Sequence, residues 1–408
     1  MSNKPRILLV THQFTPHVSP RTTRWSILCE ELVERGYKVN VITGTRQNKE
    51  IKNNYRVIYF GSNKLGRIVE SARKASNNTD GSNPAKRLIF YFLKRVYRLF
   101  YRTFAWPDYS MLWFFSVRRN RKNIPDYDLL ISVSLPFTSH LVAYSINKSK
   151  KRKWIMDIGD PFYLKKDAPE NNKYLFSYLN RYFENKFYRT ADNVLFTHHE
   201  SMKYHTNVFN VLYGRASVLP PVYRENKNGQ TSEFDYAKRP IKIAYFGVLT
   251  AGVRTPDNCL GFINNLMIKD LQIHWYTNED SKQMVKKIGN QYINHIFHEM
   301  VPRSEALFLM SREYHALLNI GNANPFQLPS KVIEYISTGK PVIHFSEIND
   351  DPVELLLNER SNTIIISKKS NVENIKKDLN QKLFTDENLE SFSKYDSRSV
   401  AETLINLI

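Results

Sequence analysis

The sequence predicts an α/β protein with two Rossmann-like domains that face each other across a cleft. Short apolar runs alternate with helical patterns in both halves of the chain, which is typical of parallel sheets covered by helices. A polar stretch from residue 224 to residue 239 separates the two halves. The length of 408 residues also suits two domains. In such sheets, ligands bind beyond the ends of the strands, so the loops there are the candidates for function.

The apolar runs place strands in both halves. The first half is expected to hold strands at residues 6–11, 37–43, 55–60, 129–133, 153–157 and 193–197, with helices at 22–35 and 174–189. The second half is expected to hold strands at 241–245, 273–276, 315–320, 341–345 and 363–366. The expected domains are therefore residues 1–225 and 240–390. A C-terminal helix is expected over 391–408. Either it stays with the second domain or it crosses back to the first.

Bulk composition favours a cytoplasmic protein. Cys29 and Cys259 are the only cysteines, so no disulfide framework is predicted. No apolar run approaches the roughly 18 residues that span a bilayer. The apolar run at 7–10 is too short for a secretory leader.

A net charge of +20 points to an anionic partner, and much of it lies in residues 86–122. This basic segment has ten Lys and Arg residues, one acid (Asp108) and many aromatic side chains. Over 86–104 the apolar residues share one helical face, and Lys94, Arg98 and Arg102 share another. Such a helix fits the inner face of an anionic membrane. The alternative is a helix that packs on its own domain with a solvated basic face. No nucleic-acid-binding motif accompanies the charge, so no nucleic acid is expected.

The most informative stretch is residues 328–335, Leu-Pro-Ser-Lys-Val-Ile-Glu-Tyr, followed by Gly-Lys-Pro at 339–341. It follows an expected strand and a polar loop, and it reads as the start of a helix. Pro329 and Ser330 would open that helix, where backbone N–H groups and the cation Lys331 suit a phosphate. Glu334 lies three residues on, on the same face, where a carboxylate suits ribose hydroxyls. The alternative is an ordinary surface Lys–Glu pair.

Two further residues follow the expected strand 241–245. Gly247 would let the backbone approach a ligand closely, and Arg254 would pair with a diphosphate as a fork donor. The alternatives are a turn glycine and a solvated surface charge.

In the first half, three side chains follow the first expected strand. His17, Ser19 and Arg21 are expected on the acceptor side, and Pro20 stiffens the chain where the helix begins. A loop histidine without function is the alternative for His17.

Asp160 and His140 also follow expected strands. Asp160 is expected to bind a hydroxyl group or to assist as a general base, with a structural helix cap as the alternative. His140 either reaches the substrate or caps its helix. Asp157 and Asp160 without a partner histidine are a weak metal signal, so no metal is expected.

With these residues in place, the chain resembles the retaining, family-4-type glycosyltransferases of bacterial surface-polysaccharide synthesis, which have the GT-B fold. The resemblance spans nearly the whole chain. It rests on the strand at 7–11 with Pro16-His17-Val18-Ser19-Pro20-Arg21, on Arg35-Gly36-Tyr37-Lys38-Val39, Ser139-His140, 157–161, Ala191-Asp192, Tyr245-Phe246-Gly247 with Arg254, Pro329-Ser330-Lys331 with Glu334-Tyr335, and Gly339-Lys340-Pro341.

The chain departs from that family at two places. The family usually has two glutamates separated by seven residues; Glu334 matches the second, and Phe326 stands at the first. The family's glycine-rich first loop is replaced here by Ser19-Pro20-Arg21.

The resemblance implies transfer of a sugar from a UDP- or GDP-linked donor, with retention of configuration and without a metal or other cofactor. Arg254, Lys331 and the helix start at Ser330 would neutralise the departing diphosphate, and Glu334 would bind the ribose. The expected acceptor is a saccharide, lipid-linked because the basic segment lies in the acceptor-binding half. The expected setting is synthesis of capsule, O-antigen or exopolysaccharide on the inner face of the cell membrane. A sugar-nucleotide epimerase on the same fold, a basic nucleic-acid-binding protein and an inactive scaffold are the alternatives.

Overall fold

The computed structural model describes residues 4–17, 19–44, 55–61, 95, 102–165, 169–224, 239–288, 292–325, 328–383 and 393–408. The chain divides into two compact units. Unit 1 comprises Met1–Pro220 and Ala401–Ile408, and unit 2 comprises Pro221–Val400. Residues 225–238, most of the expected linker, lie outside the described residues.

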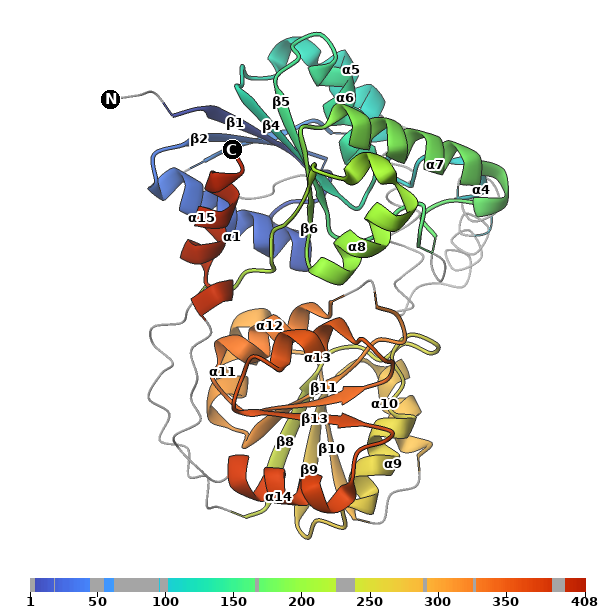
Figure 1. Ribbon diagram of the computed structural model, residues 1–408, viewed down its shortest axis with the longest axis vertical. Helices are drawn as coiled ribbons and strands as arrows, with labels where there is room; N and C mark the ends of the chain where they lie inside the picture. The colour runs from blue at the N-terminus through green and yellow to red at the C-terminus, as the bar shows by residue number, and fades with distance from the viewer. Residues whose placement is uncertain are drawn as a thin grey trace, which may run out of the picture. The chain divides into compact units, whose positions relative to one another are not determined.

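Unit 1 is built on a sheet of seven strands among the residues that the structure describes (Figure 1). Its order is β3-β2-β1-β4-β5-β6-β7, and every pair is parallel. The strands are β1 (Arg6–Val10), β2 (Lys38–Thr43), β3 (Arg56–Tyr59), β4 (Leu129–Ser134), β5 (Lys153–Ile158), β6 (Asn193–Phe196) and β7 (Ala216–Val218). The order reverses direction between β1 and β4, which is the point at which doubly wound sheets open a crevice at the ends of their strands.

The helices of unit 1 have clear start and stop signals. Helix α1 (Pro20–Glu34) begins with Pro20 after the capping hydroxyl of Ser19, and it ends before Gly36, whose φ of +85° suits glycine. Helix α7 (Lys173–Thr190) is capped by the Asn172 side chain, which accepts from two backbone N–H groups. The others are α4 (Arg102–Phe104), α5 (Met111–Arg119), α6 (Thr138–Asn147), α8 (His199–Val208) and α15 (Ser397–Asn406), which begins in unit 2 and ends in unit 1.

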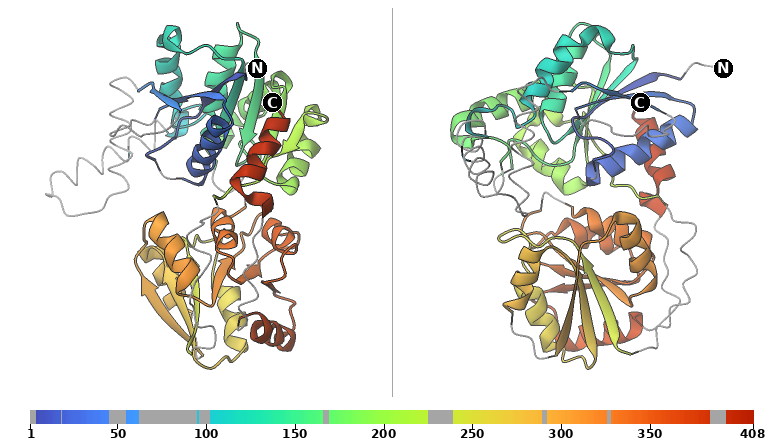
Figure 2. Two further views of the ribbon diagram at one scale, coloured as in Figure 1. Left: turned by 90° about the vertical axis from the view of Figure 1, so that its left-hand side faces the viewer. Right: turned by 180° about the vertical axis from the view of Figure 1, so that it is seen from behind.

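Unit 2 repeats the plan with a six-stranded parallel sheet in its described residues. Its order is β10-β9-β8-β11-β12-β13. The strands are β8 (Ile241–Phe246), β9 (Leu271–Tyr276), β10 (Ile293–His298), β11 (Ala316–Ile320), β12 (Val342–Ser346) and β13 (Thr363–Ser367). The helices are α9 (Asp257–Asn265), α10 (Glu279–Lys286), α11 (Arg303–Arg312), α12 (Ser330–Ser337), α13 (Pro352–Leu357) and α14 (Val372–Lys382). Figure 2 shows helices on both faces of each sheet.

The structure confirms the predicted α/β class with two domains. Each predicted strand is present, with ends that shift by one or two residues. Strands β7 and β10 were not predicted. Strand β10 does not show the apolar pattern, because its sequence, Ile-Asn-His-Ile-Phe-His, has polar residues between the apolar ones. One of them, His298, stacks its ring on Tyr276.

A buried ion pair fixes the end of β5 to α1 in unit 1. Arg24 donates to Asp157 at 2.9 and 3.1 Å, and the Trp25 indole donates to the same carboxylate at 2.7 Å. Asp157 is fully buried. Because each charge compensates the other, the pair is structural, and Asp157 is not available to a ligand.

None of the described helices is long and apolar enough to cross a membrane.

Candidate functional site

Strand β8 and helix α12 meet at the carboxyl edge of unit 2, the edge where its strands end. Tyr335 of α12 is buried, and its hydroxyl accepts from Phe246 N at 2.8 Å at the end of β8. Burial raises the pKa of Tyr335, while the charges of Arg254 and Glu334 shift that pKa in opposite directions. Both charged groups therefore lie near one hydroxyl. The predicted residues after β8 and those on α12, separated by about eighty residues in sequence, are brought together.

Glu334 is held between two cations. Arg303 Nε donates to Glu334 Oε1 at 2.7 Å, and Lys331 Nζ donates to Oε2. The carboxylate is 14% exposed, whereas both cations are about one-third exposed. Lys331 and Glu334 thus share a helix face as predicted. Arg303, at the start of α11, was not predicted, because it follows the unpredicted strand β10.

Pro329 and Ser330 mark the start of α12, as predicted. Pro329 immediately precedes the helix, and Ser330 is its first residue. No side chain in the described part of the chain caps this end. The positive end of the helix dipole and the Lys331 ammonium group therefore lie in the same first turn, an arrangement that favours an anion.

Arg254 is positioned by an amide rather than by a carboxylate. Its Nε and Nη2 donate to Asn322 Oδ1 at 3.1 and 2.8 Å. Asn322 is almost fully buried and lies in the loop after β11. Because the amide carries no net charge, it orients the guanidinium group and leaves its positive charge uncompensated by that partner.

Two glycines shape this edge. Gly247 has φ of +157°, in the region that L-residues rarely adopt, and a Cβ there would make only ordinary contacts. The backbone conformation, more than crowding, thus favours glycine. At Gly321, a Cβ would collide with the Asp351 carboxylate and lie 3.0 Å from Phe345 O, so this glycine is required by close packing.

In unit 1, the predicted acceptor-side residues gather at the carboxyl edge of the sheet. Arg21 Nη2 donates to Asp160 Oδ2 at 2.7 Å, and Arg21 also donates to Leu135 O. Ser19 accepts from Thr22 N at 3.2 Å and so caps α1. Arg21, in the first turn of α1, thus links the loops after β4 and β5. The sequence predicted both residues separately but not their pairing.

His140 is fully buried in α6. Trp154 Nε1 donates to Ser132 Oγ at 2.8 Å, and Ser132 Oγ lies 2.7 Å from His140 Nδ1. An indole only donates, so Ser132 Oγ accepts from Trp154, and its hydrogen bond with His140 Nδ1 runs in the direction set by the histidine tautomer. Burial, helped by the charge of Arg21, lowers the pKa of His140 to about 3, so the ring is neutral.

The Nε2 atom of His140 is buried and has no hydrogen-bond partner among the described residues. His140 is the third residue of α6 and not its cap residue, which is Phe137. His17 is exposed, and its backbone N–H donates to Phe14 O at 3.0 Å.

The basic segment 86–122 is described only in part. Residues 86–94 and 96–101, with most of the predicted amphipathic helix, lie outside the described residues, as does Phe326. In the described part, Trp113 and Val117 of α5 pack into the core, and Arg118 and Arg119 lie exposed in its last turn. This short helix therefore packs on its own unit.

The described residues hold no group of three or more His, Cys, Asp or Glu side chains placed to bind a metal ion.

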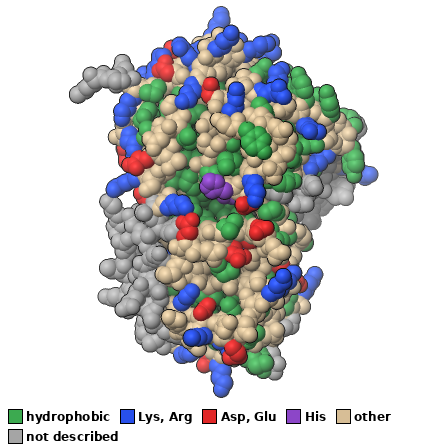
Figure 3. Space-filling model, viewed as in Figure 1, with side chains coloured by type: hydrophobic (Ala, Val, Ile, Leu, Met, Phe, Trp, Pro, Cys, Tyr) green, Lys and Arg blue, Asp and Glu red, His purple; other side chains and the backbone are tan. Residues whose placement is uncertain are grey.

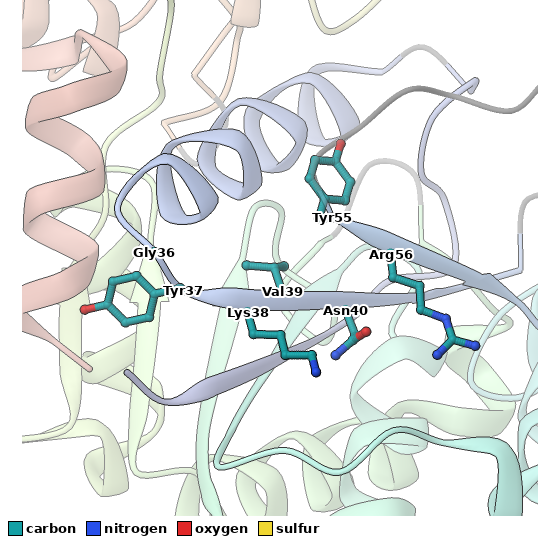
Figure 4. Close-up of a pocket in the computed structure, with 7 residues that line it drawn as sticks. All are labelled: Gly36, Tyr37, Lys38, Val39, Asn40, Tyr55 and Arg56. Carbon is teal, nitrogen blue, oxygen red and sulfur yellow. The ribbon is translucent and has the colours of Figure 1, made fainter. Parts of the chain in front are cut away.

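A pocket of about 440 Å³ lies at the opposite edge of unit 1, where β2 and β3 begin. Figure 4 shows Lys38, Asn40 and Arg56 pointing to one side of these strands and Tyr55 to the other. The predicted residues all follow the ends of strands, so this pocket is separate from them.

Comparison with solved structures identifies the fold. HepE of Anabaena, solved in complex with UDP, aligns over 98% of this chain and 99% of its own, with a TM-score of 0.59 and 11% identity. The same protein solved with UDP-glucose aligns over 99% of both chains, also with a TM-score of 0.59.

The chain has the GT-B fold.

Two lipopolysaccharide enzymes share this GT-B fold. WaaG, a glycosyltransferase involved in lipopolysaccharide biosynthesis, aligns over 97% of this chain and 95% of its own, with a TM-score of 0.54 and 12% identity. WaaB, the lipopolysaccharide outer core galactosyltransferase, aligns over 98% of both chains, with a TM-score of 0.55 and 13% identity. No family model and no curated protein sequence matches the chain.

Proposed function

We propose that the chain is a glycosyltransferase that moves a sugar from a UDP- or GDP-linked donor to a saccharide acceptor. The observation that carries the proposal is the arrangement around α12. Glu334 lies between Lys331 and Arg303, and Tyr335 ties the helix to the strand that leads to Gly247 and Arg254. The GT-B fold and the UDP complexes of HepE support it and make UDP the first nucleotide to test.

The chemistry of the transfer needs the positive charges. The bond between the sugar C1 and the diphosphate oxygen breaks, and the departing diphosphate gains negative charge. The acceptor hydroxyl bonds to C1 through its oxygen and gives up its proton, to Asp160 or to water. Arg254, Lys331 and the first turn of α12 stabilise that charge at preformed donors. Each charge-assisted contact contributes about 1.5–3 kcal/mol.

Donor binding then exchanges the partners of Lys331 and Glu334. Without donor, the lysine neutralises the glutamate; with donor, Lys331 turns to the diphosphate, and Glu334 accepts hydrogen bonds from the ribose hydroxyls. Arg303 keeps one carboxylate oxygen in place during this change. The exchange avoids leaving either charge unpaired at a partly buried position, which would be costly.

The acceptor side of the proposal rests on unit 1. Asp160, oriented by Arg21, binds an acceptor hydroxyl or assists its deprotonation, and Ser19 and His17 line the same edge. The neutral His140, whose Nε2 is unpartnered among the described residues, would contribute a hydrogen bond to the substrate. The transfer proceeds with retention and without a metal. The acceptor is lipid-linked, in surface-polysaccharide synthesis, and the protein is a cytoplasmic one held at the inner membrane face by residues 86–122.

The deciding experiment is a thermal-shift panel of UDP, GDP, ADP, CMP and NAD on the wild type, on Glu334→Ala and on Glu305→Ala. Glu305 is an exposed carboxylate in the first turn of α11 and serves as the matched control. We expect one nucleoside diphosphate to stabilise the wild type and the control, and to lose this effect in Glu334→Ala. If no nucleotide stabilises the wild type, the proposed donor site is wrong.

Product analysis separates the alternatives. An epimerase converts the donor without any acceptor, whereas a transferase attaches the sugar to one. A nucleic-acid-binding protein binds strands with a steep salt dependence that Glu334→Ala does not change.

A further inference from the structure

A row of tyrosines on helix α7 is exposed to solvent. Tyr174, Tyr178 and Tyr182 recur every four residues, so they lie on one face of the helix. Their exposed fractions are 101%, 79% and 49%, and the neighbouring Leu175 and Leu179 are 52% and 36% exposed. We call these five residues the tyrosine face. Large apolar side chains exposed in a contiguous group mark an interaction surface, whereas single ones do not.

The charges on α7 indicate an anionic partner. The helix carries Lys173, Arg181, Lys186 and Arg189, and its one acid, Glu184, is fully buried. Glu184 accepts from Tyr188 at 2.7 Å inside the core, and burial raises its pKa to about 7. The exposed surface of α7 therefore presents cations and no carboxylate. In Figure 3, hydrophobic (green) and basic (blue) side chains lie together at the upper right, over α7.

The cations and rings are interleaved rather than separated. Lys186 lies 5.8 Å from the ring centre of Tyr182 and 5.7 Å from that of Phe183. Tyr178 and Tyr182 stack with their ring centres 6.5 Å apart. A tyrosine has an apolar ring and a polar hydroxyl, and it prefers the boundary between lipid and water. Lysine and arginine at the same depth are attracted by anionic headgroups, at about 1 kcal/mol each.

Helix α7 also contacts the described end of the basic segment, on its buried side. Trp106 Nε1 donates to Asn180 of α7 at 3.0 Å, and the Trp106 ring lies 4.6 Å from Phe183. Phe104, two residues earlier, is 62% exposed. Trp106, within the described part of the basic segment, therefore packs against α7.

We propose that α7 lies on an anionic phospholipid surface, with the tyrosine face at the level of the headgroups. A second copy of the chain fits less well, because two such faces would bring cations against cations. The tyrosine row spans about 12 Å along a helix of about 27 Å, which gives a flat contact and not an insertion across the bilayer. This deepens the proposed function, since a lipid-linked acceptor would be met at that surface.

The test labels one position with an environment-sensitive dye. The native Cys29 and Cys259 are both buried, so a new exposed cysteine is labelled selectively. Tyr178→Cys reports on the tyrosine face, and Tyr213→Cys, at a tyrosine that is 66% exposed elsewhere on unit 1, is the control. Each is mixed with phosphatidylcholine vesicles with and without phosphatidylglycerol. We expect the emission of the dye at position 178 to shift to the blue with anionic vesicles only, and that of the dye at position 213 to stay unchanged.

A second measurement gives the strength of the contact. The triple variant Tyr174→Ser/Tyr178→Ser/Tyr182→Ser is compared with Tyr213→Ser/Tyr292→Ser in vesicle sedimentation. We expect the triple variant to lose affinity on the order of tenfold, or about 1.4 kcal/mol, and the control to lose little. Both variants should keep the wild-type melting temperature within a few degrees.

Three results would overturn the inference. One is unchanged emission of the dye at position 178 although the protein sediments with anionic vesicles, since the contact would then lie elsewhere. Another is a dye shift that grows with protein concentration in the absence of lipid, which would indicate a second copy. The third is no sedimentation with anionic vesicles at low salt. Transfer to a water-soluble acceptor is measured in parallel: its absence in the wild type counts against the proposed function alone, whatever the vesicles show.

Discussion

The charged side chains at the carboxyl edges of the two sheets are paired in different ways. In unit 1, Asp157 pairs with Arg24 and Asp160 pairs with Arg21, so each carboxylate has its own arginine. In unit 2, Glu334 faces two cations, Lys331 and Arg303, and Arg254 is held by the neutral amide of Asn322. The two pairs of unit 1 are balanced, whereas Arg254, Lys331 and Arg303 together outnumber Glu334. A balanced pair suits neutral hydroxyl groups, whereas the group of three cations suits a diphosphate.

The largest expected effect concerns the buried pair of unit 1. Asp157→Asn leaves the Arg24 charge buried without its counter-charge, which should cost about 3–5 kcal/mol of unfolding free energy. Asp160→Asn, in a pair that is about one-quarter exposed, should cost no more than about 1 kcal/mol. Urea unfolding of both variants tests the contrast. Equal losses would mean that the two pairs of this edge do not differ in burial energy.

The positive charges of unit 2 should control catalysis more than stability. Arg254→Ala and Lys331→Ala should each lower kcat/KM about tenfold to a hundredfold, because each removes one charge-assisted contact to the diphosphate. Lys376→Ala is a matched control, since Lys376 pairs with Glu373 three residues away on α14. Full activity in both site variants would refute the assignment of these two cations.

The smallest effect is expected at Arg303. It touches Glu334 and is about one-third exposed, so solvent screens its charge. Arg303→Ala should weaken donor-nucleotide binding by at most about fivefold, equal to about 1 kcal/mol. Arg312→Ala, at the other end of α11, should leave it unchanged. Isothermal titration of the nucleotide measures both. A loss in Arg303→Ala as large as that in Lys331→Ala would make Arg303 a direct ligand of the donor.

Local patterns predicted most of the strands but only one of the ion pairs at the candidate sites. The strand at 7–10, Ile-Leu-Leu-Val, is a continuous apolar run, because a central parallel strand is covered on both faces. The Lys331–Glu334 pair follows from helix spacing alone. Strand β10 was missed because His295 and His298 replace apolar residues, one on each face of the strand, and Arg303 was missed with it.

The remaining contacts join residues that are far apart in sequence. Tyr335 and Phe246 are 89 positions apart, and Arg254 and Asn322 are 68 apart. Arg21 and Asp160 are 139 apart. Nothing in the local composition around these residues specifies such pairs, since they depend on which strands lie side by side in the sheet. The fold class was therefore accessible from the sequence, whereas the partners of each charged side chain were not.

The route of the chain has a consequence for biosynthesis. Unit 2 is one continuous stretch, Pro221–Val400, whereas unit 1 takes in Ala401–Ile408 as well as its first 220 residues. Ala401 and Leu404 are fully buried, and Lys153 Nζ donates to Ile408 O at 2.6 Å. Domains usually fold in the order in which the ribosome makes them. Here the order is inverted at the last step: unit 2 has its complete sequence before unit 1 does, and the first domain to emerge is the last to be completed.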